Sequence, residues 1–153
     1  MRLVLICVGK VRPPFSDDAA HYERLLGRHA RLEVVEIGEA GADAARAHEA
    51  LPREGAAILK RIPEDSFACV LDREGQELTS TELAAFIEER RMARADVCFI
   101  VGGPLGLDQT VMERAQRRLA FGRITLPHQL ARVVLLEQLF RAHKILAGEP
   151  YHY

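Results

Sequence analysis

Cysteine is scarce in this sequence, and its arrangement argues against two classes of protein. The chain has three cysteines, Cys7, Cys69 and Cys98, and each lies inside a short apolar run. An odd number cannot form a complete disulfide framework, and the spacings match no zinc-binding pattern. We therefore expect three small buried hydrophobic side chains, no disulfide and no metal site.

Long apolar runs are absent as well. No stretch approaches the roughly 20 residues that a membrane-spanning helix needs. The opening segment, MRLVLICVGK, is too short and too soon charged for a secretion signal. With 153 residues, of which 48% are hydrophobic, the chain can still bury one proper core. The sequence thus predicts a single cytoplasmic domain over residues 1–153 that makes no contact with a membrane.

A charge excess of either sign is also missing. The formal net charge is -1, which does not favour DNA binding and requires any RNA-binding surface to be local. Only three of the 21 basic residues are lysines. Arginine suits phosphate binding and base stacking, but a genome-wide composition bias would produce the same excess. The arginines near 90–94 and 114–118 fit solvated helix faces or binding patches.

Four short apolar segments have the composition of buried strands. They cover residues 2–8, 31–37, 66–72 and 96–101, and helical patterns separate them. Nearly continuous apolar strands that alternate with helices are typical of an α/β fold, a parallel sheet with helices on both faces. A fifth, very short strand is expected at 123–126, RITL.

Capping residues and prolines predict where the first helices begin. Asp17 is a suitable N-cap for the first helix, and Pro52 should begin a new helix or kink an existing one. The segment 72–78, DREGQEL, reads as a turn. Thr79 and Glu82 have the spacing of a capping box.

Two helices are expected in the last third of the chain. Asp108 should cap a helix that runs toward Leu119. The last helix should begin near Pro127, a favoured residue of the first turn, and end at the stop signal of Gly148 and Pro150.

A glycine-rich segment follows the strand at 96–101. In IVGGPLGLD (100–108), Gly102, Gly103 and Gly106 come directly after the strand, where an open α/β sheet binds ligands. A tight turn explains these glycines as well as a cofactor loop does. The chain has no GxxxxGK[ST] phosphate loop, and after the first strand only Gly9 stands where a dinucleotide fingerprint would begin.

Two further places could carry chemistry. Asp72 ends another strand, where it could face the same crevice or simply begin a turn. His128 and Arg132 are four residues apart in the last helix, so they share a face near its positive end. Such a pair can hold an anion or handle a proton, although a histidine at a helix start is often only a surface residue or a cap.

The segments quoted above, taken together, resemble a known family. VLDREGQELTSTELAAFI, VGGPLGLD, ITLPHQLARVVLLEQLFRAHKI and the terminal EPYHY are similar to the SPOUT-class ribosomal RNA large subunit methyltransferase H family. Its members methylate N3 of pseudouridine 1915 in helix 69 of 23S rRNA, on assembled 70S ribosomes. The resemblance covers the full chain, and this combination of motifs is highly specific.

The resemblance implies a fold and a cofactor. The fold is a parallel α/β sheet whose C-terminal part, about 96–153 here, is threaded as a deep trefoil knot in an obligate homodimer. S-adenosylmethionine lies in the knot crevice, held mainly by the backbone of three loops. The matching positions in this chain are Leu71, Gly102, Gly103, Gly122, Arg123, Ile124, Thr125, Leu126 and Pro127.

The resemblance also implies roles for side chains. His128 is the candidate to position or relay the N3 proton, and Arg132 the candidate to hold a phosphate or the developing anion. Tyr151 and His152 match the family's substrate-binding tail, while Tyr153 stands where a basic residue is common. A Gly103→Val change is expected to abolish cofactor binding and leave the fold intact.

Two other functions remain to be distinguished from this enzyme. A knotted RNA-binding or ribosome-binding module without catalysis would share these motifs, but it would have lost the affinity for the cofactor. An unrelated nucleotide-binding α/β protein is disfavoured, because both phosphate-loop patterns are missing.

Overall fold

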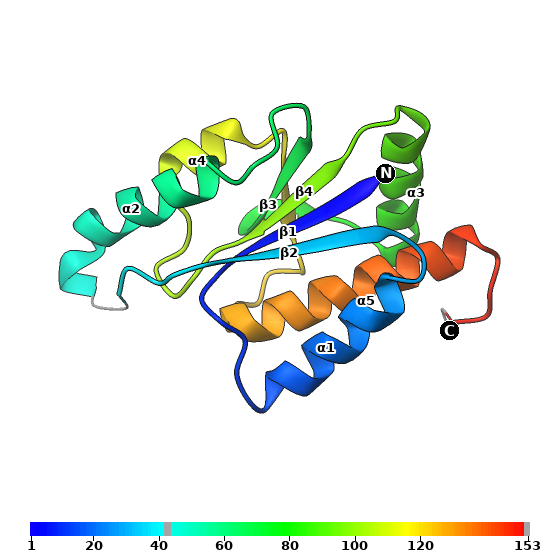
Figure 1. The fold of residues 1–153 in the computed structure, drawn as a ribbon, viewed down its shortest axis with the longest axis horizontal. Coiled ribbons are helices and arrows are strands. Elements are labelled where there is room, and N and C mark those ends of the chain that lie inside the picture. Colours follow the sequence, from blue (N-terminus) through cyan, green and yellow to red (C-terminus); the bar gives the residue numbers. More distant parts are fainter. Residues whose placement is uncertain (42–43, 152–153) are drawn as a thin grey trace.

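A five-stranded parallel sheet forms the centre of the computed structural model, which describes residues 1–41 and 44–151 (Figure 1). The spatial order of the strands is β2-β1-β4-β3-β5, and every neighbouring pair is parallel. The strands are β1 (Arg2–Val8), β2 (Arg31–Ile37), β3 (Phe67–Glu77), β4 (Val97–Val101) and β5 (Arg117–Ala120). The predicted α/β class with a parallel sheet is confirmed.

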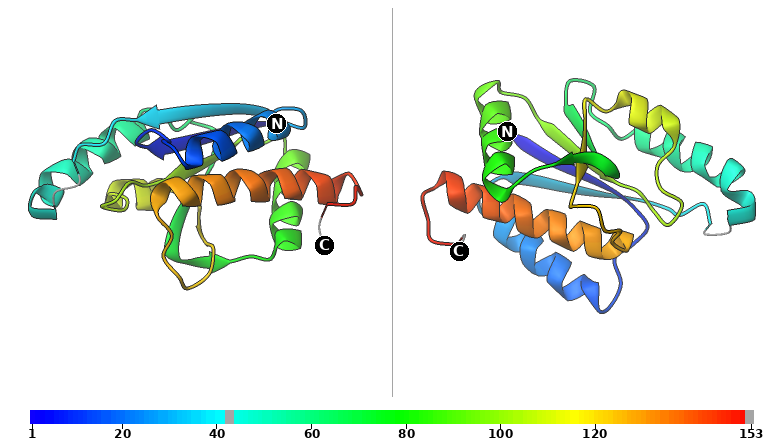
Figure 2. Two further views of the ribbon diagram at one scale, coloured as in Figure 1. Left: turned by 90° about the horizontal axis from the view of Figure 1, so that it is seen from below. Right: turned by 180° about the vertical axis from the view of Figure 1, so that it is seen from behind.

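Helices cover both faces of the sheet. One face carries α1 (Phe15–Leu26), α3 (Ser80–Met92) and α5 (His128–Leu146), and the other carries α2 (Ala47–Leu59) and α4 (Gln109–Arg114). The longest helix, α5, packs between α1 and α3 (Figure 2). A short 3-10 turn, Ala44–Arg46, precedes α2.

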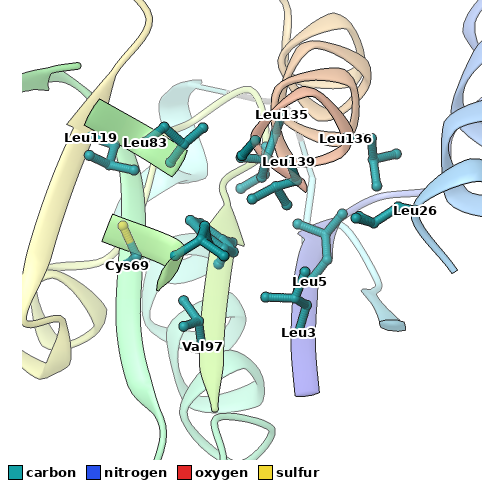
Figure 3. Packing of buried hydrophobic residues seen from close by; sticks show 14 of the residues in the cluster. Leu3, Leu5, Leu26, Cys69, Leu83, Val97, Leu119, Leu135, Leu136 and Leu139 are labelled. Carbon is teal, nitrogen blue, oxygen red and sulfur yellow. The ribbon is translucent and has the colours of Figure 1, made fainter. Parts of the chain in front are cut away.

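The alternation of side chains along β1 divides the core into two layers. Leu3 and Leu5 point to the face of α1, α3 and α5, where they join Leu135 and Leu139 (Figure 3). Val4, Ile6 and Val8 point to the face of α2 and α4. Both faces of the central strands are therefore buried, which is why their sequences read as continuous apolar runs.

The first helix begins earlier than its sequence indicated. We expected Asp17 as the N-cap, but α1 begins at Phe15 with Pro14 in the N-cap position. The carbonyl oxygen of Arg12 accepts hydrogen bonds from the backbone N–H groups of Phe15 and Ser16. The expected cap was wrong by three residues, because the turn at Pro14 supplies the first helical bonds. Asp17 lies in the first turn, where its charge complements the helix dipole.

The region between α4 and α5 differs most from the prediction. The expected helix from Asp108 to Leu119 ends at Arg114, and β5 follows it. The strand expected at 123–126 is absent from this described part of the chain, which forms a loop there. Pairing with the edge of β3 draws residues 117–120 out of the helical pattern, so tertiary contacts override local propensity.

The turn expected at 72–78 is instead an extension of a strand. β3 continues to Glu77 and pairs with β5 on two registers, with a shift between Leu71 and Gln76. Gly75 passes so close to β5 that a Cβ there would lie 2.7 Å from the backbone of Arg118 and of Leu119. A glycine at this position therefore permits the two backbones to touch.

Most of the other expected helix signals are confirmed. Thr79 and Glu82 form a capping box, and the Asp108 side chain accepts a hydrogen bond from the N–H of Thr110. α5 begins after Pro127, and Gly148 follows its end with a positive φ of 67°. The start of a new helix at Pro52 is not confirmed, since α2 runs from Ala47 to Leu59 through this proline as one helix.

The three cysteines are buried, free thiols, as the sequence indicated. Burial raises the pKa of Cys7, Cys69 and Cys98 from 9.0 to about 12. Across residues 1–41 and 44–151, every helix is too short or too polar to cross a bilayer.

Candidate functional site

A pocket of about 820 Å³ lies beyond the carboxyl ends of β3 and β4. The loop after β4, the loop 121–127 and the first turn of α5 form its other walls. Open α/β sheets bind ligands at this edge, because the strand ends diverge there into adjustable loops. Its size lies within the range typical of cofactor sites.

Nearly all of the predicted cofactor-binding residues line this pocket. The exception is Arg123, whose exposed side chain lies outside its walls. The residues that line it are Leu71, Gly102, Gly103, Gly122, Ile124, Thr125, Leu126 and Pro127. The structure thus brings together three loops that are about 20 to 30 residues apart in sequence.

The glycine loop after β4 is both a tight turn and a pocket wall. The N–H of Gly106 donates to the carbonyl of Gly103 at 3.0 Å, and Gly106 has a φ of +81°. A Cβ at Gly102 would lie 2.8 Å from the carbonyl oxygen of Gly106. The two interpretations of this segment are therefore compatible, since the turn holds backbone groups at the pocket surface.

Gly103 faces the core as well as the pocket. A Cβ at Gly103 would lie 2.8 Å from Cγ1 of Val8, and Val8 is 2% exposed in the layer beneath α2 and α4. The expectation that Gly103→Val leaves the fold intact is wrong, because the added side chain would press on Val8. That substitution cannot separate cofactor binding from stability.

Of the two predicted catalytic residues, His128 and Arg132, His128 is the one that lines the pocket. It begins α5, and it lines the pocket beside Pro127. Its Nε2 atom is buried, lies 3.4 Å from Oε1 of Glu39, and makes no hydrogen bond to another described residue. The buried nitrogen thus faces a carboxylate, while the ring forms part of the pocket wall.

Arg132 lies one turn further along α5 but does not line the pocket. Its guanidinium donates to Glu36 at 2.8 Å and to Glu23 at 3.1 Å, and the residue is 5% exposed. Burial lowers its pKa, but Cys7, Glu36 and Glu23 outweigh burial and raise it above the ordinary value. Arg132 therefore joins α5 to β2 and α1, and it lies outside the walls of the pocket.

Asp72 lines the pocket on the opposite side, at the break in β3. Its carboxylate lies 3.8 Å from a guanidinium nitrogen of Arg118 and accepts a long hydrogen bond from the N–H of Glu74. Asp72 thus combines the crevice position with a local turn contact, and it places a negative charge in the pocket.

The described part of the tail packs on α5, away from the pocket. The Tyr151 ring lies 4.9 Å from the Phe140 ring and 4.9 Å from the Arg141 guanidinium carbon. Its hydroxyl donates to Glu137 at 3.3 Å. His152, the second predicted tail residue, lies outside the described residues.

The arginine clusters have a largely structural use. Arg90 stacks on Phe67 at 4.8 Å and Arg117 on Phe86 at 4.5 Å. Arg114 donates to two backbone carbonyls of the loop before β3. Cation–π stacking and carbonyl capping thus account for three of these side chains.

Glu39 is the residue of this site that the sequence did not reveal. It follows β2 by two residues and contacts His128, whose position in the sequence is about 90 residues away. A carboxylate just beyond a strand end was the available signal. The sequence did not indicate that α5 would lie across the end of β2.

The chain matches known proteins over nearly all of its length. Residues 1–152 match the family model described as "Predicted SPOUT methyltransferase". The chain is 45% identical to the ribosomal RNA large subunit methyltransferase H of Rubrobacter xylanophilus, over 99% of the chain and 98% of that protein. The protein of the same name from Carboxydothermus hydrogenoformans is 42% identical, with 99% of each covered.

Solved structures resemble the chain at the level of the fold. The structure of a "probable methylase family protein" from Haemophilus influenzae matches with a TM-score of 0.54, at 13% identity, over 99% of this chain and 70% of that one. The structure of a "Probable Methyltransferase" from Bordetella pertussis gives a TM-score of 0.56 at 17% identity, over 92% of this chain and 95% of that one.

Proposed function

The chain belongs to the SPOUT methyltransferase family, and within it to the ribosomal RNA large subunit methyltransferase H family, and on this basis we propose that it transfers a methyl group to ribosomal RNA. The observation that carries the proposal is the joint position of His128 and three loop segments around one pocket. A catalytic side chain and a cofactor pocket are the two parts that such an enzyme needs.

The methyl donor in this proposal is S-adenosylmethionine. The pocket offers apolar walls from Leu71, Leu107 and Met112, together with the backbone of the glycine loop and one carboxylate, Asp72. These groups suit a ligand with an aromatic base, a polar ribose and a positive charge. When bound, S-adenosylmethionine supplies an activated methyl group on a sulfonium, so the protein has only to align the acceptor and remove its proton.

The acceptor in this proposal is N3 of pseudouridine 1915 in helix 69 of 23S rRNA, on the assembled ribosome. The family resemblance supports this choice of base, and the names of the curated relatives support ribosomal RNA. The net charge of -1 fits a substrate whose shape and protein neighbours contribute to recognition, since phosphate binding alone would favour a more basic chain.

His128 is the proposed proton handler. N3 of a uracil ring carries a proton that must leave as the N–C bond forms. A neutral imidazole at the pocket wall can accept this proton, and general base catalysis typically contributes a factor of about 10² to 10⁴ in rate. Nε2 is buried and faces Glu39, so the proposal assigns Nδ1 as the nitrogen that meets the substrate.

Arg132 has a different proposed role from that of His128. The sequence suggested that it holds a phosphate or an anion, and that role stays a prediction. Its ion pairs with Glu23 and Glu36 favour a positioning role, because they fix the first turns of α5 against α1 and β2.

We also propose that residues 96–153 form the trefoil knot of the family and that the protein is a cytoplasmic homodimer. The return of the chain from the edge strand β5 to α5, which lies between α1 and α3, supports a threaded path. An apolar groove lined by Leu83, Phe121 and Val134 supports a second copy as its occupant. The tail residues Tyr151 and His152 are proposed to contact the substrate.

Single-turnover methylation with saturating ribosomes tests the proposal. The wild-type protein should bind S-adenosylmethionine in a calorimeter and transfer its methyl group to rRNA, and His128→Ala should keep the affinity but transfer at least 100-fold more slowly. No cofactor affinity and no transfer by wild type would instead indicate a ribosome-binding module, whereas cofactor affinity without transfer would contradict the proposed substrate. An unchanged rate in His128→Ala would refute the proton role.

A further inference from the structure

The carboxylate of Glu39 occupies a site that two other residues create. Its Oε1 lies 3.4 Å from the buried Nε2 of His128. On the other side is Gly9, which has a φ of +87°, and the space that a Cβ at Gly9 would fill is taken by the same carboxylate. The N–H of Gly9 donates to the carbonyl of Ile37 at 2.7 Å, so the ends of β1 and β2 are fixed together around it.

The start of α5 is held against this site by a second contact. The side chain of Gln129 accepts a hydrogen bond from the N–H of Arg12 at 2.8 Å. This bond joins the first turn of α5 to the segment after β1. The imidazole of His128 is thereby kept between the pocket and Glu39, since the next residue of the helix is anchored.

The other charged side chains that the structure describes near the pocket do not contact His128, because they form ion pairs with other residues or lie on another wall of the pocket. Arg132 is paired with Glu23 and Glu36, and Asp72 lies near Arg118 on the opposite wall. Within the described part of the chain, Glu39 is the carboxylate that approaches His128 within 4.0 Å.

We propose that Glu39 is a positioning residue for His128, a role that rests on the proposed function of the histidine. As N3 of the acceptor base loses its proton to Nδ1, the imidazole becomes an imidazolium with N–H groups on both nitrogens. Nε2–H then donates to the Glu39 carboxylate, which offsets the new positive charge and fixes the ring. With S-adenosylmethionine bound, the electron pair left on N3 would form the bond to the methyl carbon, and the electrons of the broken carbon–sulfur bond would remain on the departing thioether.

The same arrangement explains Gly9. This glycine follows the first strand but belongs to no phosphate-binding pattern. The geometry assigns it another use, because only a residue without a Cβ leaves room for the Glu39 carboxylate behind His128.

A double-mutant cycle in the full-length protein tests this role. The variants are Glu39→Gln, His128→Ala and their combination, with Glu39→Asp as the conservative change. Glu64→Gln is the matched control, since it removes one exposed carboxylate that lies outside the pocket. Single-turnover rates, KM for ribosomes and cofactor affinity are measured for each.

We expect Glu39→Gln to reduce the single-turnover rate about tenfold or more, with KM and cofactor affinity unchanged. Glu39→Asp should recover part of that loss, and Glu64→Gln should match wild type. In the His128→Ala background, Glu39→Gln should have no further effect, because its action passes through the imidazole. The ¹⁵N resonance of His128 Nε2 should move in Glu39→Gln even without substrate.

Three results would overturn the inference. The first is a normal rate in Glu39→Gln while His128→Ala is slow. The second is an equal loss from Glu39→Gln with and without His128, and the third is an unmoved Nε2 resonance. A normal rate in His128→Ala would refute the proton role itself, and the two failures are thus distinguishable.

Discussion

Arg132 and Glu36 form an ion pair of 2.8 Å between α5 and β2, and Glu23 of α1 completes it at 3.1 Å. The pair lies one helical turn behind the pocket, and the arginine side chain is 6% exposed. The first turns of α5, which carry His128, therefore depend on charges from two elements that precede it by about 100 residues.

Arg132→Met should destabilise the protein by about 2–3 kcal/mol, because it leaves two partly buried carboxylates without their shared cation. Urea denaturation measures this difference. Arg91→Met is the matched control, since its partner Glu88 lies on the exposed face of α3 and such pairs contribute under about 1 kcal/mol. Equal costs for the two variants would contradict the structural role of Arg132.

Gly9→Ala should destabilise the fold by about 1–2 kcal/mol. Its φ of +87° belongs to the left-handed region, which costs an alanine about that much. The new Cβ would also displace the Glu39 carboxylate. Thermal unfolding measures the effect, with Gly38→Ala as the control, because Gly38 has open space around its Cβ position and no positive φ. If Gly9→Ala is as stable as wild type, the space between Gly9 and the Glu39 carboxylate behind His128 is not sterically constrained.

Ile124→Ser should weaken binding of S-adenosylmethionine about fivefold, because an apolar side chain at the pocket mouth would lose roughly 1 kcal/mol of burial. Ile124 and Met92 are each 72% exposed, but only Ile124 lines the pocket. Met92→Ser is thus the control, and neither change should shift the melting temperature appreciably. Titration calorimetry gives both affinities, and an equal effect in both variants would refute the location of the cofactor.

The free energy of unfolding should fall as the pH rises above 9. Burial raises the pKa of Cys7, Cys69 and Cys98 from 9.0 to about 12, so the unfolded chain releases these protons first. The neutral thiols favour the folded state fully below pH 9, and the advantage is lost between about pH 9 and 12.

The contribution of a single thiol to the slope of unfolding free energy against pH can be measured with a cysteine variant. Cys98→Ala should reduce the slope between pH 9 and 11 by up to about 1.4 kcal/mol per pH unit, the contribution of one proton. Urea denaturation of both proteins at several pH values measures it. An identical slope in the variant would show that the Cys98 thiol ionises as easily in the folded state as in the unfolded chain.

The central strands could be predicted from the sequence because both of their faces are buried. β1 and β4 read as unbroken apolar runs, and their ends were placed within one residue. β5 could not be predicted, since it is a four-residue edge strand with two arginines. Only its pairing with β3 distinguishes it from the end of a helix.

The part of the candidate site that is formed by backbone loops could be predicted from the sequence. The glycine loop and residues 124–127 line the pocket, as the motif indicated. The spacing of His128 and Arg132 placed them on one helix face, but it did not reveal that the first faces the pocket and the second faces Glu23 and Glu36. Those partners come from distant parts of the chain, which no local pattern encodes.

Transfer of labelled methyl from S-adenosylmethionine to ribosomes that lack this modification, followed by mapping of the labelled nucleotide, tests the proposed activity most directly. We expect the label on N3 of the helix 69 pseudouridine in 23S rRNA, with transfer abolished or greatly slowed in His128→Ala. Cofactor binding without any label on rRNA, or label on another nucleotide, would contradict the proposed substrate.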